Sequence, residues 1–177
     1  MIKDRVLIPR LEVLEEGVVR AHATGEEVEL LEGPDNGLYA RLGRVARAFG
    51  YRVVDDDDKT SGILRDGRVG LNKAFYEGPE LLIKQMSPLR MAAVLAHELG
   101  HGFTQPVWNE DDLKERETVA EATAYLVCDS QGLDISSQAF PYIAGYNQGN
   151  FTDEMRKGTL VASGSIIQAL AWHPAQD

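Results

Sequence analysis

Apolar residues in the first 50 positions recur at helical spacing. One set predicts a helix over residues 5–24, whose regular part starts at Pro9: Val6, Leu7, Leu11, Leu14 and Val18. A second set predicts a helix that Asp35 caps and Gly50 ends: Leu38, Leu42, Val45, Ala46 and Phe49. Residues 1–50 are therefore expected to form N-terminal helices.

The pattern changes after Gly50 to short runs rich in β-branched residues. Three such runs, at 51–54, 62–65 and 69–72, predict strands, and Asp66-Gly67 between the last two is a hairpin signal. Residues 51–73 are therefore expected to form a small antiparallel or mixed sheet of about three strands.

Helical patterns return in the second half of the chain. Ser87-Pro88 is a strong helix start, and the run that follows is apolar nearly all round until Gly102 ends it after His101, as expected of a buried helix. A further helix is expected from 111 or 112 to Gln131, so residues 87–132 would carry two helices. Residues 133–177 would be a C-terminal loop followed by a helix near 158–172. The whole chain, 1–177, is thus expected to be a single domain of the α+β class.

The first of these two helices carries the sequence His97-Glu98-Leu99-Gly100-His101. Residues four apart lie one above the other on a helix, so the two imidazoles can face one metal ion while Glu98 is turned toward an attacking water as catalytic base. Gly100 weakens the helix within the motif, which suggests that another part of the backbone passes close to it. The pattern predicts a zinc site.

A catalytic zinc ion needs a third protein ligand and an open fourth position. Glu117 and Glu121 lie four residues apart on the next expected helix and could both face the metal helix. We expect Glu117 to bind the ion and Glu121 to hydrogen-bond a ligating histidine. The reverse assignment stays open, because the sequence does not fix the rotation of the helix.

Composition restricts the partners and the location of the protein. The net charge of -10 repels nucleic-acid phosphates, and the row of Arg41, Arg44 and Arg47 fits a solvated helix face. Cys128 is the only cysteine, so a cysteine zinc cluster is excluded. The sequence shows neither a signal peptide nor a membrane-spanning run. We therefore expect a cytoplasmic protein with a protein or peptide partner, no nucleic-acid binding by itself and no membrane association.

The stretch from His97 to Cys128, with its second motif Glu-Thr-Val-Ala-Glu-Ala-Thr-Ala-Tyr-Leu-Val-Cys, resembles the ImmA/IrrE metallopeptidases and the peptidase domain of ArdC-like antirestriction proteins. Residues 132–146 are similar to the ArdC-like branch in particular. The resemblance covers about residues 60–170. There is no room for the N-terminal single-strand DNA-binding domain of ArdC, so antirestriction by DNA binding is not expected.

The resemblance implies a zincin-like metallopeptidase fold, zinc held by two histidines and one glutamate, and a role in mobile-element control, regulator cleavage or antirestriction. It also implies an edge strand that presents substrate, which we place at Val69, Gly70, Leu71 and Asn72. Tyr142 and Tyr146 follow the ligand helix, and either phenol could stabilise an oxyanion.

The sequence therefore predicts zinc-dependent hydrolysis of peptide bonds in a protein target, with a regulator in a mobile-element, phage or stress context as one candidate target. Two alternatives stay open. A metal-bound scaffold could act as a protein-binding antirestriction or regulatory module without proteolysis. A zinc hydrolase of a small amide would need an enclosed pocket in place of a groove.

Overall fold

The computed structural model describes residues 11–15, 18–21, 27–29, 31–56, 63–65, 80–84, 87–104, 113–147 and 150–172, with side chains in 31–54, 87–104, 113–145 and 150–172. The helices in these ranges are α1 (Leu38–Ala48), α2 (Pro88–Thr104), α3 (Leu113–Asp129), α4 (Ser136–Asn147) and α5 (Asp153–Trp172). The strands are β1 (Leu11–Glu15), β2 (Val18–Ala21), β3 (Glu27–Glu29), β4 (Arg52–Asp56), β5 (Ile63–Arg65) and β6 (Glu80–Lys84).

Helices dominate the part of the chain whose side chains are described. In those ranges 77% of the residues are helical, and the only strand is the short β4, with no sheet. The prediction of an α+β, zincin-like fold built on a sheet of about three strands is therefore wrong, and the described structure is mainly α-helical. The physical reason is that the helices bury their apolar faces mostly against one another.

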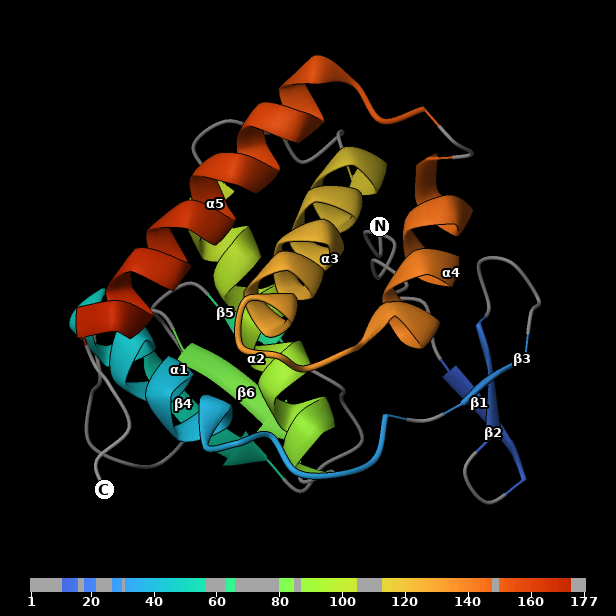
Figure 1. Cartoon of the computed structure of the whole chain (residues 1–177), viewed down its shortest axis with the longest axis horizontal. Coiled ribbons are helices and arrows are strands. Elements are labelled where there is room, and N and C mark those ends of the chain that lie inside the picture. Colours follow the sequence, from blue (N-terminus) through green and yellow to red (C-terminus); the bar gives the residue numbers. More distant parts are fainter. Residues whose placement is uncertain are drawn as a thin grey trace, which may run out of the picture.

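The core lies around α2, which packs against α1, α3 and α5 (Figure 1). Its largest fully buried side chains come mainly from these helices and include Leu42, Leu95, Leu99, Val119 and Ile166. The predicted burial of α2 is confirmed, because every residue from Leu89 to His101 except three is buried. A helix enclosed in this way holds its polar side chains in fixed positions, which suits a site.

The predicted start of α2 is confirmed, whereas its predicted end is wrong. The Ser87 hydroxyl accepts a hydrogen bond from the Arg90 amide at 3.4 Å, and Pro88 is the first helical residue. The helix does not stop at Gly102 but continues to Thr104. A Cβ at position 102 would lie 2.5 Å from the Tyr51 hydroxyl oxygen, so this glycine makes room for a neighbouring side chain.

The other helices agree with the sequence to different degrees. Helix α3 was predicted closely, and Gly132 follows it with a φ of 73°. Helix α5 begins at Asp153, five residues before the expected start at 158, with the Thr152 hydroxyl accepting a hydrogen bond from the Met155 amide at 3.2 Å. Helix α4 occupies residues expected to be a loop and contains Pro141 inside it.

The N-terminal prediction of a helix over residues 5–24 is wrong for the positions that the structure describes. Strands β1 and β2 are antiparallel, with Val13 opposite Val19, and β3 pairs with β2. The Glu16-Gly17 pair lies between two short runs that suit strands as well as one helix, and the pattern alone did not separate the two.

The other strands are also defined by backbone pairing. Strand β4 is parallel to β6, and β6 is antiparallel to β5. The predicted hairpin through Asp66-Gly67 would instead have paired β5 with 69–72, a segment that lies outside the described residues. Strand β6 was not predicted.

None of the described helices combines the length and apolar character needed to cross a membrane.

Candidate metal centre

Helices α2 and α3 run in opposite directions and touch closely at Gly100. His97 pairs with Glu121, and His101 pairs with Glu117. Residue numbers therefore increase along α2 in the direction in which they decrease along α3. A Cβ on Gly100 would lie 3.1 Å from the Ala120 Cα atom and 3.3 Å from its carbonyl oxygen. The close backbone approach that the sequence suggested at Gly100 is confirmed, and it brings the α3 carboxylates within reach of the imidazoles.

Substituting alanine for Gly100 should destabilise the protein, whereas Gly164→Ala should stabilise it. Both glycines lie inside helices, where alanine gains about 1 kcal/mol of helix propensity. Gly164 has open space around a new Cβ, but at Gly100 the Ala120 backbone must move, which costs about 1–3 kcal/mol. The free energies of unfolding of the two variants, measured with denaturant, should therefore differ by about 1 kcal/mol or more. Equal stabilisation of both would contradict the close contact.

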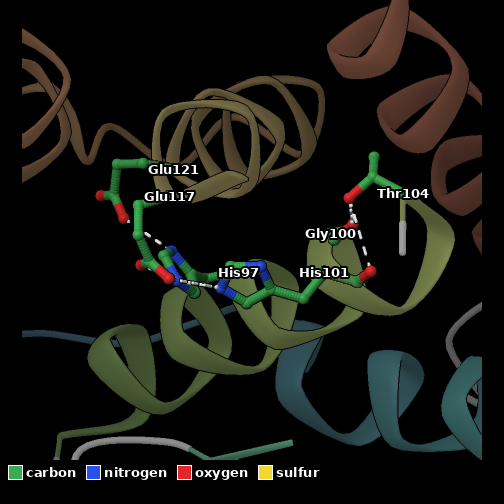
Figure 2. Close-up of polar contacts among 6 residues, drawn as sticks. All are labelled: His97, Gly100, His101, Thr104, Glu117 and Glu121. Carbon is green, nitrogen blue, oxygen red and sulfur yellow. Dashed lines mark hydrogen bonds and ion pairs between the residues drawn. The ribbon is translucent and has the colours of Figure 1, made fainter. Parts of the chain in front are cut away.

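Three side chains converge at this crossing, and we call His97, His101 and Glu117 the ligand triad. Figure 2 shows the imidazoles on α2 and the carboxylate reaching them from α3. The two Nε2 atoms are 3.1 Å apart. The Glu117 carboxylate oxygens lie 3.3 Å from His97 Nε2 and 3.3 Å from His101 Nε2.

The size and chemistry of the ligand triad fit a zinc ion. Bonds of about 2.0–2.1 Å in a tetrahedron place neighbouring ligand atoms about 3.3–3.4 Å apart. The Nε2–Nε2 separation of 3.1 Å is close to this value, and each Nε2 atom lies 3.3 Å from a different oxygen of the Glu117 carboxylate. Two imidazole nitrogens and one carboxylate are also a donor set that zinc uses in catalytic sites. The residues present could therefore hold one such ion.

Glu121 lies outside the ligand triad and contacts the other side of His97. Its Oε2 atom is 2.8 Å from His97 Nδ1, shown as a dashed line in Figure 2. When the neutral imidazole donates from Nδ1, its Nε2 lone pair is free for a metal. This is the arrangement that the assignment of Glu117 as ligand and Glu121 as supporter requires. His101 Nδ1 is buried without a hydrogen-bond partner among the described residues. Within these residues, a carboxylate therefore contacts Nδ1 of His97 but not Nδ1 of His101.

The histidines and carboxylates of this cluster also shift one another's pKa values. Burial opposes a charge on His97, but hydrogen bonds with Glu117 and Glu121 outweigh it and raise its pKa well above the usual value. Burial also opposes the charge of Glu117, yet hydrogen bonds with His101 and His97 hold the pKa of that carboxyl well below its usual range. The cluster is thus a set of coupled polar groups in a largely buried place.

The remaining predicted site residues are distributed unevenly around the ligand triad. Glu98, the expected catalytic base, follows His97 on α2 and is 5% exposed. Tyr142 lies in α4 and is buried, and burial followed by the charge of Glu121 raises the pKa of its phenol, which therefore stays protonated. The side chain of Tyr146 and the whole edge-strand segment Val69–Asn72 lie outside the parts described.

Cys128 is a buried, free cysteine on α3. Burial, with a smaller contribution from Glu121, raises the pKa of its thiol to about 12. At pH 8 a thiol with that pKa is ionised to only about one part in 10⁴, against about a quarter for an ordinary exposed cysteine.

Cys128 of the folded protein should therefore react with iodoacetamide at pH 8 at least about 10³-fold more slowly than in the unfolded chain. Mass spectrometry of samples with and without denaturant measures both rates. Comparable rates in the two samples would show that the thiol is accessible and ionised in the native state.

The structure also contains an apolar groove of about 390 Å³ whose lining includes Phe49, Phe103 and Trp172. It lies at the C-terminal ends of α1, α2 and α5, and no residue of the ligand triad lines it. The groove is therefore separate from the candidate metal centre.

In comparisons with known proteins, no family model, no curated protein and no solved structure matched this chain.

Proposed function

We propose that the protein is a zinc-dependent peptidase that uses the ligand triad to hold the ion. The observation that carries this proposal is that the two Nε2 atoms lie 3.1 Å apart at the contact between α2 and α3, each 3.3 Å from one of the two Glu117 carboxylate oxygens. When bound, zinc supplies a Lewis acid that acidifies water and polarises a peptide carbonyl.

The chain's own residues would then carry the proton transfers and the positioning. Glu121 keeps the Nδ1 proton on His97, so that Nε2 is available as a ligand. Glu98 takes a proton from the attacking water and passes it to the leaving amine. Because Glu98 is buried on the same helix as both histidines, its position relative to them is fixed by the helix.

The proposed partner is a protein or peptide, in the cytoplasm, without nucleic acid or a membrane. Two features support the exclusion of nucleic acid. The net charge is -10, which opposes binding to phosphates. Arg41, one of the three arginines in the α1 row, donates a hydrogen bond from Nη1 to Gln131 at 2.8 Å and is partly buried. The row therefore presents fewer free cations than its sequence suggests.

A library of peptides from a digested proteome tests the proposal and does not require a known substrate. New peptide ends, identified by mass spectrometry, should form with the zinc-loaded protein, disappear with a chelator and return when zinc is restored. New ends that persist unchanged in chelator would contradict metal-dependent proteolysis. A zinc-loaded protein that retains peptides but creates no new ends would instead favour a binding module.

A further inference from the structure

One narrow stripe of α2 reaches the surface beside the ligand triad. Between Leu89 and His101 only Arg90, Val94 and His97 are partly exposed, and every other residue in that interval is buried. We call these three residues the α2 stripe. Their spacing of four and three residues places them on one face of the helix. A molecule that contacts His97 can therefore follow this face toward the N-terminal end of α2.

Arg90 is the cation of this stripe. Its Nε atom is buried and has no hydrogen-bond partner within the described part of the chain. The described residues also include no ion pair of Arg90 within 4.0 Å, although Glu32 acts on it electrostatically from farther away. A buried guanidinium nitrogen without a partner is costly, and a carboxylate is the group that satisfies it best.

The Tyr142 hydroxyl lies within electrostatic range of Arg90 and of the two α3 carboxylates. Burial raises the pKa of this phenol, Glu121 and Glu117 raise it further, and Arg90 lowers it. Tyr142 belongs to α4, which packs against α3.

The distance along the stripe corresponds to a short peptide. His97 follows Arg90 by seven positions along the helix, an axial distance of about 10 Å. An extended peptide rises about 3.3 Å per residue, so about three residues span this distance. The chain has a net charge of -10, and Arg90 supplies a positive charge on the α2 stripe that an anionic group can pair with.

Resting on the proposed peptidase function, we propose that Arg90 determines specificity by binding a substrate carboxylate about three residues from the bond at the metal centre. The carboxylate can come from an acidic side chain or from the C-terminus of the peptide. Arg90 pairs with it while Val94 contacts the intervening chain. The peptide would lie along the partly exposed α2 stripe between Arg90 and His97.

The test is a binding measurement that does not require cleavage. Zinc-loaded Glu98→Gln protein is incubated with a synthetic library of random peptides, made with free and with amidated C-termini, and retained peptides are identified by mass spectrometry. Peptides with Asp, Glu or a free C-terminus should be enriched about tenfold or more, which corresponds to one charge-assisted hydrogen bond. The two library forms distinguish side-chain from terminal carboxylates.

The preference should disappear when Arg90→Gln is added and should persist when Arg156→Gln is added. Arg156 is a matched control because it is an exposed arginine on α5. Zinc content should stay the same in all variants, since neither arginine belongs to the ligand triad. A library without carboxylate enrichment, or enrichment that survives Arg90→Gln, would overturn the proposal for Arg90. Carboxylate-selective binding without hydrolysis by the wild type would retain that proposal and reject the peptidase function.

Discussion

Replacing Glu98 with glutamine should lower kcat/KM for peptide hydrolysis by about 10²–10⁴-fold, the usual contribution of a positioned general base. Glutamine keeps the size of the side chain but cannot accept the proton from water. Zinc content should be unchanged, because Glu98 lies outside the ligand triad. The rates of both proteins are measured on any peptide that the wild type cleaves.

Glu115→Gln provides the matched control for this loss. Glu115 is a partly exposed carboxylate in the first turn of α3 and does not belong to the ligand triad. Its removal should change the rate by less than about twofold, since surface substitutions outside a site have small effects. If Glu98→Gln retains the wild-type rate, Glu98 is not the base and the proposed reaction must be assigned to other groups.

The second large effect is expected at the two α3 carboxylates, which should differ from each other. Glu117→Ala should abolish zinc binding, because the substitution removes the only carboxylate of the ligand triad. Glu121→Ala should keep zinc with an affinity about 10–100-fold lower, as is typical when the partner of a ligating histidine is lost. Competition with a chelator of known affinity measures both values.

The two variants also test the assignment between these carboxylates. If Glu121→Ala loses zinc and Glu117→Ala keeps it, ligand and supporter are exchanged. Similar small losses in both variants would contradict a site built on three protein ligands. Circular dichroism of each variant serves as the control for folding, because both side chains lie on the packed helix α3.

Local signals predicted the parts of the structure that local physics determines. The capping hydroxyl of Ser87 and the proline after it marked the start of α2, and the apolar run predicted its burial. The four-residue spacing of His97 and His101 placed both imidazoles on one face. The cost of glycine inside a helix pointed correctly to a close neighbour at Gly100.

Errors arose where distant parts of the chain decide the outcome. Gly102 reads as a helix stop, but the Tyr51 side chain fills the space beside it and the helix continues. Helix α4 forms over residues that were expected to be a loop, and it contains Pro141 in its interior. The predicted fold class was wrong because three short strand-like runs were expected to form a small sheet packed on helices, whereas helices supply most of the buried core.

Arg90 was missed because nothing in the sequence around it marks a site. The signal that could have found it is its position seven residues before His97, on the same face of a helix that is otherwise apolar. A charged residue on that face needs either solvent or a partner. The structure was needed to show that the residues on the other faces of α2 are buried, which leaves this face as the exposed one.

The most direct test of the central claim is the zinc content of the purified protein. After chelation, dialysis against zinc and removal of excess ion, elemental analysis should find about one zinc per chain, as one ligand triad requires. The His97→Ala, His101→Ala double variant, checked for folding by circular dichroism, should take up essentially none. A folded wild-type protein that binds no zinc would show that His97, His101 and Glu117 form only a hydrogen-bonded cluster, and would contradict the account.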